Sequence, residues 1–234
     1  MGENRAMVRA VPTEELLWTL NDTERKFAPA ELFTAGDESL LRSPCVSVVG
    51  SRKASAEGLA RARRFARLLV ERGVTVVSGL AEGIDTAAHR SAIEHGGRTI
   101  AVLGTPLDEC FPAKNRELLE LIMREHLAVS QFAPGTKTGR HSFPIRNRTM
   151  ALLSDATVII EAADGSGSLH QAWEALRLGR QLFLAKSLFD NPRLEFPREL
   201  EAYGAEVLED EESVELLCDE LPRGGREHAA ELPF

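Results

Sequence analysis

The chain has 234 residues, of which 43% are hydrophobic and 27% charged, and its formal net charge at pH 7 is −8. These values are ordinary for a soluble globular protein with one sizeable core, and the negative charge excludes an affinity for nucleic acid that rests on net charge alone. The N-terminus lacks the apolar stretch of a signal peptide and no run has the length of a membrane span, so we expect a cytoplasmic protein that does not enter a membrane.

The first 43 residues are predicted to form a short helical lead-in that is too small to be a domain. Within it, Thr13–Trp18 has the pattern of a short capped helix, and Pro29–Phe33 leads into the next element. At the other end of the chain, residues 221–234 are predicted to be a disordered tail.

Residues 44–220 show the pattern of a single α/β domain. Short, β-branched and nearly continuous apolar runs end at glycine or polar residues, as strands buried on both faces do. The predicted strands are Val46–Val49, Val74–Val77, Thr99–Leu103 and Thr157–Ile160, with Leu182–Leu184 and Ala205–Leu208 as candidate late strands. The amphipathic stretches are Ala56–Arg72, Ile84–His95, Lys114–His126, Arg146–Ser154 and Ser168–Leu178. This alternation predicts a doubly wound, mostly parallel sheet of the extended Rossmann type.

One segment differs from the rest of the chain in its charge. No Asp or Glu occurs in the 29 residues from 126 to 154, although 36 acids in 234 residues predict about four (29 × 36/234). This carboxylate-free segment contains Lys137, Arg140, Phe143, Arg146 and Arg148. A cationic surface that includes an aromatic ring is suited to single-stranded nucleic acid. The block Glu206–Glu220, by contrast, has eight acids and no base, so a polyanion site is expected elsewhere.

Glycine-rich turns follow several predicted strands, at the end of the sheet where doubly wound proteins bind ligands. The first turn, Gly50-Ser51-Arg52-Lys53, offers a hydroxyl, backbone amides and two cations to a phosphate. Each turn alone is equally compatible with a purely structural role. No turn has the G-x-G-x-x-G or Walker A pattern, and the three cysteines form no paired motif, so we predict no cofactor, no metal and no ATP hydrolysis. The predicted phosphate- or nucleotide-binding rim consists of Gly50, Ser78, Gly79, Gly83, Gly104, Gly165, Ser166, Gly167 and Ser168.

Five ordered blocks, which span roughly residues 30–190, resemble the signature blocks of the DNA processing protein A (DprA/Smf) family. They are residues 48–55 (VVGSRKAS), 76–89 (VVSGLAEGIDTAAH), 97–104 (GRTIAVLG), 143–148 (FPIRNR) and 161–169 (EAADGSGSL). The resemblance implies an extended Rossmann domain that binds single-stranded DNA without cutting it. It also implies a homodimer that helps to load a RecA-type recombinase during DNA uptake or recombination.

The family's strand-binding positions can be carried onto matching residues of this sequence, and none of them is catalytic. Phe143 can stack on a base, and the arginines can bind phosphates through two hydrogen bonds each. The predicted DNA contacts are Ser51, Arg52, Lys53, Lys137, Phe143, Arg146, Asn147 and Arg148.

Structural roles remain open for several of these residues. A phenylalanine before a proline is often a core residue. Arg146 and Arg148 are two positions apart and cannot both be central on one helical face, so one of them could instead pair with Asp85, Asp155 or Glu161. Asn147 is equally suited to capping a helix. Outside this set, the arginines of Ala56–Arg72 have the spacing of a solvated outer face, and His89 has the pattern of a core histidine.

Departures from the family pattern leave other functions open. Family members usually carry a helical lead-in domain and often a C-terminal winged helix, so this chain is predicted to be a minimal core. One alternative is a nucleotide-sensing Rossmann protein. Another is a phosphoribohydrolase of the distantly similar LOG-like group, which Gln171 disfavours because that group has a catalytic glutamate there. A homodimer is expected to use apolar surface within Leu182–Phe189.

Overall fold

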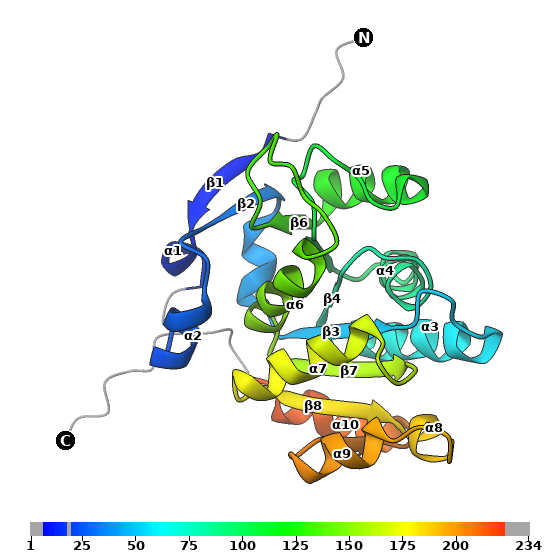
Figure 1. Cartoon of the computed structure of the whole chain (residues 1–234). Coiled ribbons are helices and arrows are strands. Elements are labelled where there is room, and N and C mark those ends of the chain that lie inside the picture. Colours follow the sequence, from blue (N-terminus) through cyan, green and yellow to red (C-terminus); the bar gives the residue numbers. More distant parts are fainter. Residues whose placement is uncertain (1–6, 18–19, 223–234) are drawn as a thin grey trace.

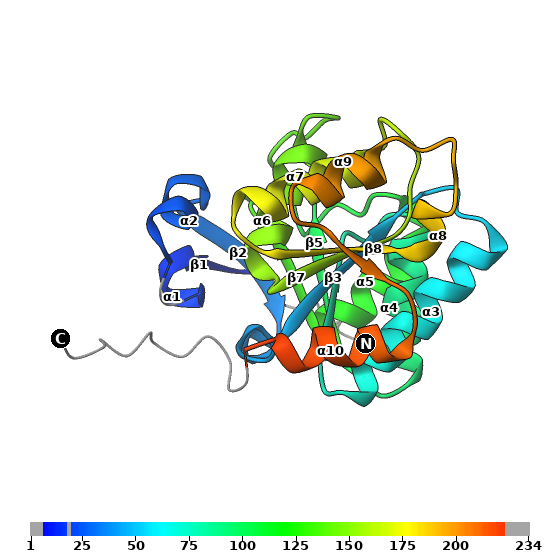
Figure 2. The ribbon, with the colours of Figure 1, turned by 90° about the horizontal axis from the view of Figure 1, so that it is seen from below.

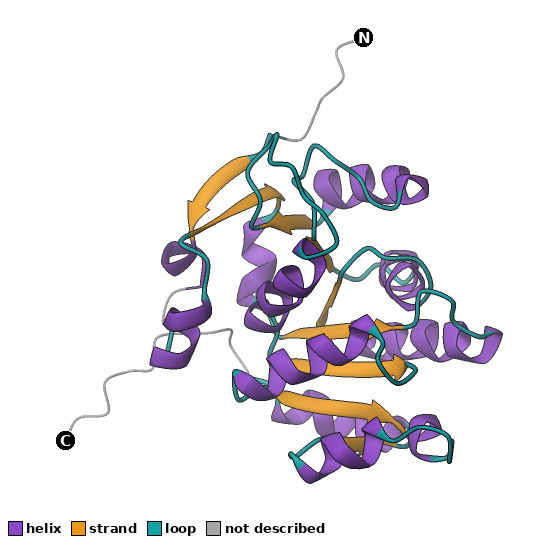
Figure 3. Cartoon of the chain, in the orientation of Figure 1, coloured by secondary structure: helices purple, strands orange, loops and turns teal. Residues whose placement is uncertain are grey.

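The computed structural model describes residues 7–17 and 20–222, and these form a nine-stranded sheet flanked by helices (Figures 1 and 3). The strand order is β1-β2-β6-β5-β4-β3-β7-β8-β9, and every ladder is parallel except β1 with β2 and β2 with β6. The predicted doubly wound, mostly parallel α/β fold is therefore confirmed. The strands are β1 (Arg9–Pro12), β2 (Glu31–Gly36), β3 (Cys45–Gly50), β4 (Thr75–Ser78), β5 (Thr99–Leu103), β6 (Leu127–Ser130), β7 (Ala156–Glu161), β8 (Gln181–Ala185) and β9 (Glu206–Leu208).

Helices cover both faces of the sheet, which Figure 2 shows nearly edge-on. One face packs against α6 and α7, and the other against α3, α4, α5 and α10. The α-helices are α1 (Thr13–Leu17), α2 (Asp22–Phe27), α3 (Ala56–Glu71), α4 (Ile84–Glu94), α5 (Arg116–Glu125), α6 (Ser142–Leu153), α7 (Gly167–Arg177), α8 (Lys186–Phe189), α9 (Phe196–Ala202) and α10 (Glu211–Glu220). Two 3-10 helices are η1 (Glu38–Arg42) and η2 (Ala113–Asn115).

The central strands read as continuous apolar runs because both of their faces are buried. In β3, Val46 and Val48 pack in the cluster formed with α3 and α4, whereas Val49 packs in the cluster that contains α6. All three side chains are buried. Because side chains alternate between the two faces of a strand, one short sequence contributes to two separate hydrophobic clusters.

The order of the strands reverses between β3 and β7. From β3 the chain moves outward through β4, β5 and β6, and it then returns to place β7 against the other side of β3. In open α/β sheets, ligands bind at the carboxyl ends of the strands at this reversal. Gly50 ends β3 and Glu161 ends β7, so the turns after these residues flank the position where the topology favours a ligand.

Several elements differ from the sequence prediction. Residues 1–43 were predicted to be a helical lead-in, but they also contribute β1 and β2, and β2 pairs with β6, a strand that the sequence did not predict. Helix α6 begins at Ser142, four residues early, because Pro144 lies in its first turn, where a missing N–H costs no helical hydrogen bond. Leu182, Leu184 and Leu188 are buried, so most of the apolar surface expected within residues 182–189 is interior.

The predicted tail, 221–234, lies outside the described residues from position 223 onward. Leu221 itself is buried against the core that includes α3 and α10. Within the part of the chain that is described, no helix is long and apolar enough to cross a membrane.

Candidate nucleic-acid interface

The turn after β3 presents two exposed cations, Arg52 and Lys53, on an anchored backbone. The Ser51 N–H donates to the Glu161 carbonyl at 2.7 Å, and the Ser51 carbonyl accepts the Ile84 N–H at 3.2 Å. The Lys53 N–H donates to Ser51 Oγ at 3.1 Å. Because these bonds hold the backbone, little ordering of the main chain is left for a ligand to impose.

Glu161, at the end of β7, ties this turn to helix α3. Its carboxylate accepts the Ser55 N–H at 2.9 Å and the Ser55 hydroxyl at 2.5 Å. Ser55 is the N-cap of α3, because its Oγ accepts the Gly58 N–H at 2.9 Å. A carboxylate at a helix N-terminus is stabilised by the helix dipole. Glu161 is thus a structural acid at the rim, and Arg61 lies 3.8 Å from it.

An aromatic cluster, formed by Arg52, Phe111 and Phe143, lies beside the turn. The Arg52 guanidinium lies over the Phe143 ring, 5.3 Å from its centroid. The Phe111 and Phe143 rings are 5.5 Å apart between centroids and tilted by 52°. Phe111 is 51% exposed, an unusual position for so large an apolar side chain. One exposed ring, one half-buried ring and a cation offer both stacking surface and a phosphate contact.

Phe111 belongs to the candidate surface, but the sequence pattern did not single it out. It lies in the connection between β5 and η2, which is fixed by two hydrogen bonds: the Thr105 hydroxyl donates to the Glu109 carbonyl at 2.9 Å, and the Ser130 hydroxyl to the Thr105 carbonyl at 2.7 Å. The available signal was a phenylalanine between two acids and a proline, after the turn at Gly104, where no strand or helix pattern would bury it.

Lys137 lies in the connection between β6 and α6, which leads into Phe143. Its side chain is exposed and, among the described residues, it has neither an ion pair nor a hydrogen bond. Arg140 and His141 in the same connection are also exposed. This connection therefore presents exposed positive charge, and Lys137 stays a predicted DNA contact.

Arg146 points into the protein, although it was predicted to contact DNA. It is 5% exposed, and its Nη1 donates to the Val102 carbonyl at 3.1 Å. Burial lowers the pKa of Arg146, and the charge of Asp85 opposes that shift. Burial likewise raises the pKa of Asp85, and Arg146 opposes it. The two groups stabilise each other's charge, which is the structural alternative that the sequence left open.

The Arg146–Asp85 pair shapes the turn after β4. The Asp85 carboxylate accepts the N–H groups of Gly79 and Ala81, each at 3.2 Å. A Cβ atom at Gly79 would lie 1.3 Å from Arg146 Nη1, so any other residue there would have to displace the Arg146 guanidinium. The charge of Arg52 also lowers the pKa of Arg146, so the two guanidinium groups act on each other electrostatically.

Asn147 and Arg148 also have partners within the protein. The Asn147 Nδ2 donates to the Gly167 carbonyl at 3.1 Å, which links α6 to the start of α7. Arg148 Nε lies 3.1 Å from Glu174 Oε2, and its guanidinium lies 5.1 Å from the Phe27 ring centroid. These contacts give both residues structural roles, and their contact with DNA stays a prediction.

The rim glycines fall into two groups. Those of the first half of the rim, which follow β3, β4 and β5, are packed against protein atoms: an added Cβ would lie 2.6 Å from Ile84 at Gly50, 2.2 Å from the Ser51 carbonyl oxygen at Gly83 and 2.7 Å from the Phe143 ring at Gly104. Ser78 is buried, and its hydroxyl donates to the Val48 carbonyl at 2.6 Å. These predicted rim residues therefore serve close packing that positions the exposed side chains.

The second half of the rim, Gly165 to Ser168, is open. Gly165 has a φ of +71°, and a Cβ added at Gly165 or Gly167 would meet no atom within 4 Å. The Ser166 Oγ is buried without a hydrogen-bond partner among the described residues. Gln171, one turn into α7, is 1% exposed; with its amide oriented to satisfy both ends, it donates to the Asn147 carbonyl at 2.7 Å and accepts the Ala151 N–H at 3.3 Å.

Comparison with known proteins identifies the family of this chain. A family model described as DNA recombination-mediator protein A matches residues 14–218. DNA processing protein DprA of Streptococcus pneumoniae is 43% identical over 156 residues, which are 67% of this chain and 55% of that protein. DprA of Bacillus subtilis is 35% identical over 196 residues, which are 83% of this chain and 65% of that protein. The chain thus spans less than two thirds of the length of either relative.

Solved structures give the same result. A crystal structure of S. pneumoniae DprA matches with a TM-score of 0.77 at 33% identity, and covers 91% of this chain and 74% of that chain. A structure of DprA from Helicobacter pylori, reported for its single-stranded DNA binding mode, matches with a TM-score of 0.78 at 25% identity, and covers 93% and 98%. A molybdenum cofactor carrier protein from Chlamydomonas reinhardtii, at 18% identity and a TM-score of 0.53, shares the fold alone. The chain belongs to the DNA recombination-mediator protein A (DprA) family.

Proposed function

We propose that this protein is a non-enzymatic binder of single-stranded DNA that acts in transformation or recombination. The observation that carries the proposal is the aromatic cluster of Arg52, Phe111 and Phe143, in which Arg52 belongs to the turn after β3 that flanks the strand-order reversal. Single-strand binders combine stacking rings with cations that follow the backbone, and each stacked base contributes about 1–3 kcal/mol. The exposed Lys53 and Lys137 supply further positive charge.

The relatives support the same function. The H. pylori relative binds single-stranded DNA, as the description of its structure says. By the family resemblance, we propose further that the protein forms a homodimer and assists a RecA-type recombinase. Tyr203, which is 65% exposed and packs edge-on against Trp173 at 5.1 Å, is a candidate for such a contact surface outside the interior stretch 182–189.

The test is a binding isotherm for fluorescent oligo-dT and for a duplex of the same length, at two salt concentrations. We expect preference for the single strand and weaker binding at higher salt. Arg52→Ala should lower the affinity by roughly 10- to 100-fold, since a charged hydrogen bond contributes about 1.5–3 kcal/mol. Arg64→Ala is the matched control, because Arg64 is exposed but paired with Glu211 at 2.7 Å. Equal affinities of the two variants would overturn the site assignment.

A second candidate function is the binding of a free nucleotide at the second half of the rim. It is favoured by the open turn at Gly165–Gly167 and by the unpartnered Ser166 Oγ. Titration calorimetry with nucleoside mono- and diphosphates tests it, and an absence of heat would remove it. A phosphoribohydrolase activity is disfavoured because the buried Gln171 amide cannot act as a carboxylate there.

A further inference from the structure

A pocket of about 360 Å³ lies between α3, α4 and the turn after β3, and the Phe143 ring is not among the residues that line it. The two helices lie side by side in both ribbon views (Figures 1 and 2). Five cations and one acid line the pocket: Arg52, Lys53, Arg63, Arg90, Lys114 and Glu82. This excess of positive charge occurs in a chain of net charge −8, so the pocket is a strong local exception.

Most of this charge is not neutralised within the protein. Glu82 pairs with Lys114, whose Nζ lies 2.6 Å from the carboxylate. In the described part of the chain, no acidic side chain pairs with Lys53, Arg63 or Arg90. A concave surface with unpaired cations concentrates positive potential and attracts anions.

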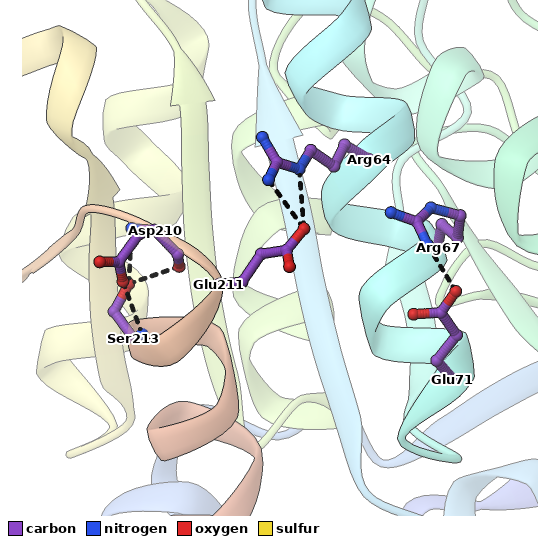
Figure 4. Close-up of polar contacts among 6 residues, drawn as sticks. All are labelled: Arg64, Arg67, Glu71, Asp210, Glu211 and Ser213. Atoms are coloured by element: carbon purple, nitrogen blue, oxygen red, sulfur yellow. Dashed lines mark hydrogen bonds and ion pairs between the residues drawn. The ribbon is translucent and has the colours of Figure 1, made fainter.

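The other arginines of α3 have the acidic partners that the pocket cations lack. Arg64 pairs with Glu211 and Arg67 with Glu71, as Figure 4 shows. Arg61 in the helix pairs with Glu161, and Arg72, which directly follows it, pairs with Glu215. Two of these acids belong to α10, part of the acidic block. The acids thus neutralise the outer face of α3, and Arg63 is the arginine that they leave to the pocket.

Hydrogen bonds from side chains hold the wall of the pocket in place. The Ser91 hydroxyl donates to the Arg63 carbonyl at 2.8 Å and so fixes α3 against α4 next to Arg90. The Asn115 Nδ2 donates to Thr86 Oγ1 and to the Leu80 carbonyl, each at 2.9 Å, and the Thr86 hydroxyl donates to the Ala81 carbonyl at 2.6 Å. Gly83 and Thr86, at the N-terminal end of α4, also line the pocket, where the helix dipole favours an anion.

Arg52 belongs to both the aromatic cluster and the pocket, since its guanidinium lies over Phe143 and the residue also lines the pocket. A strand whose bases stack on the aromatic cluster would therefore carry its next phosphates around the Arg52 turn toward Arg63 and Arg90. A backbone phosphodiester carries negative charge, which would neutralise the excess positive charge of the pocket. Its oxygens can accept hydrogen bonds from guanidinium groups.

We propose that this pocket is a second phosphate subsite, which binds a backbone phosphate of the DNA strand held by the aromatic cluster. The proposal rests on the proposed single-strand binding. It commits to DNA as the source of the phosphate, and a free nucleotide in the pocket is an outcome of the test.

The test compares the double variant Arg63→Ala/Arg90→Ala with the control Arg64→Ala/Arg67→Ala, which removes the same charge from paired positions. Affinity for oligo-dT of about 4 to about 16 nucleotides is measured over a salt series. We expect the pocket variant to bind the shortest oligonucleotide as the wild type does, and to lose affinity for longer ones. Its slope of log K against log salt should fall by about 0.7 for each lost phosphate contact.

The outcomes separate the two proposals. If Arg52→Ala loses affinity but the pocket variant matches its control at every length, the subsite is wrong and single-strand binding stands. If the wild type does not bind oligo-dT, both fail. If the pocket variant loses only the calorimetric binding of thymidine monophosphate, the pocket serves a free nucleotide and the assignment to the strand is overturned. Equal melting temperatures of the two double variants show that both are folded.

Discussion

The two ends of the carboxylate-free segment both carry cations and no acids, but for different physical reasons. Lys137 is exposed, and Phe143 packs beside the exposed Arg52 of the turn after β3, so both stay predicted contacts of a polyanion. Arg146, Asn147 and Arg148, a few residues later, direct their polar groups inward to Val102, Gly167 and Glu174. An absence of acids in the sequence therefore indicates either an exposed anion site or cations whose acids lie elsewhere in the chain, and only the fold distinguishes the two.

The inner end should control stability. Replacing Arg146 with leucine would remove both its hydrogen bond to the Val102 carbonyl and the buried charge that opposes that of Asp85, so we expect the free energy of unfolding to fall by about 3–5 kcal/mol. Urea denaturation measures this. The control is Arg140→Leu, an exposed arginine of the same segment. If both variants lost equally little stability, the claim that the inner end controls stability would be wrong.

The aromatic cluster, to which the outer end of the segment contributes Phe143, should control binding with little effect on folding. We expect Phe111→Leu to reduce the affinity for oligo-dT by about 1–3 kcal/mol, because it removes one stacking surface. Phe189→Leu is the matched control, since Phe189 also has an arginine, Arg198, 5.4 Å from its ring centroid, but lies in α8. Fluorescence anisotropy gives both affinities. A loss of the same size in the control would mean that stacking at Phe111 is not responsible.

Lys137 should contribute through charge alone. If it contacts one phosphate, Lys137→Ala should lower the slope of log K against log salt by about 0.7 and leave the unfolding midpoint in urea unchanged. Lys26→Ala removes an equal charge beside Phe27, away from the rim. A slope that is the same in both variants would remove Lys137 from the interface.

Arg148 should give the smallest effect. Its side chain is 36% exposed and pairs with Glu174, so Arg148→Ala should cost at most about 1 kcal/mol of stability. Because the guanidinium points toward α7 and Phe27, we expect the DNA affinity to stay at the wild-type value. A clear loss of affinity with unchanged stability would mean that Arg148 contacts DNA. The two ends of the segment would then not differ in role as described.

Local pattern was sufficient for the central strands and insufficient for the rest. β3, β4, β5 and β7 were predicted because their buried faces demand continuous apolar, β-branched runs. β6 was missed because Leu127–Ser130 follows helix α5 after a single residue and is only four residues long. β2 was missed because its role comes from pairing with β6, a contact about 95 residues away along the chain.

The site was predictable where it depends on exposed residues of one turn, and less so where partners are distant. Arg52, Lys53 and Phe143 lie at the rim, as their motifs indicated. The partner of Arg146 could not be chosen from sequence, because Asp85, Asp155 and Glu161 were all available. Phe111 carried no periodic pattern, so only its exposure and its distance from Phe143 bring it into the site.

The pairing of β2 with β6 also bears on how this domain resists aggregation. Phe33 to Gly36 cover the main-chain groups of Leu127 to Ser130, and β1 in turn covers β2. The final edge is only four residues long, ends at Pro12 and carries Arg9, all of which discourage another chain from adding a strand. A shortened variant that began after Gly36 would retain the whole rim, yet it would expose a flat apolar edge and self-associate before its DNA binding could be measured.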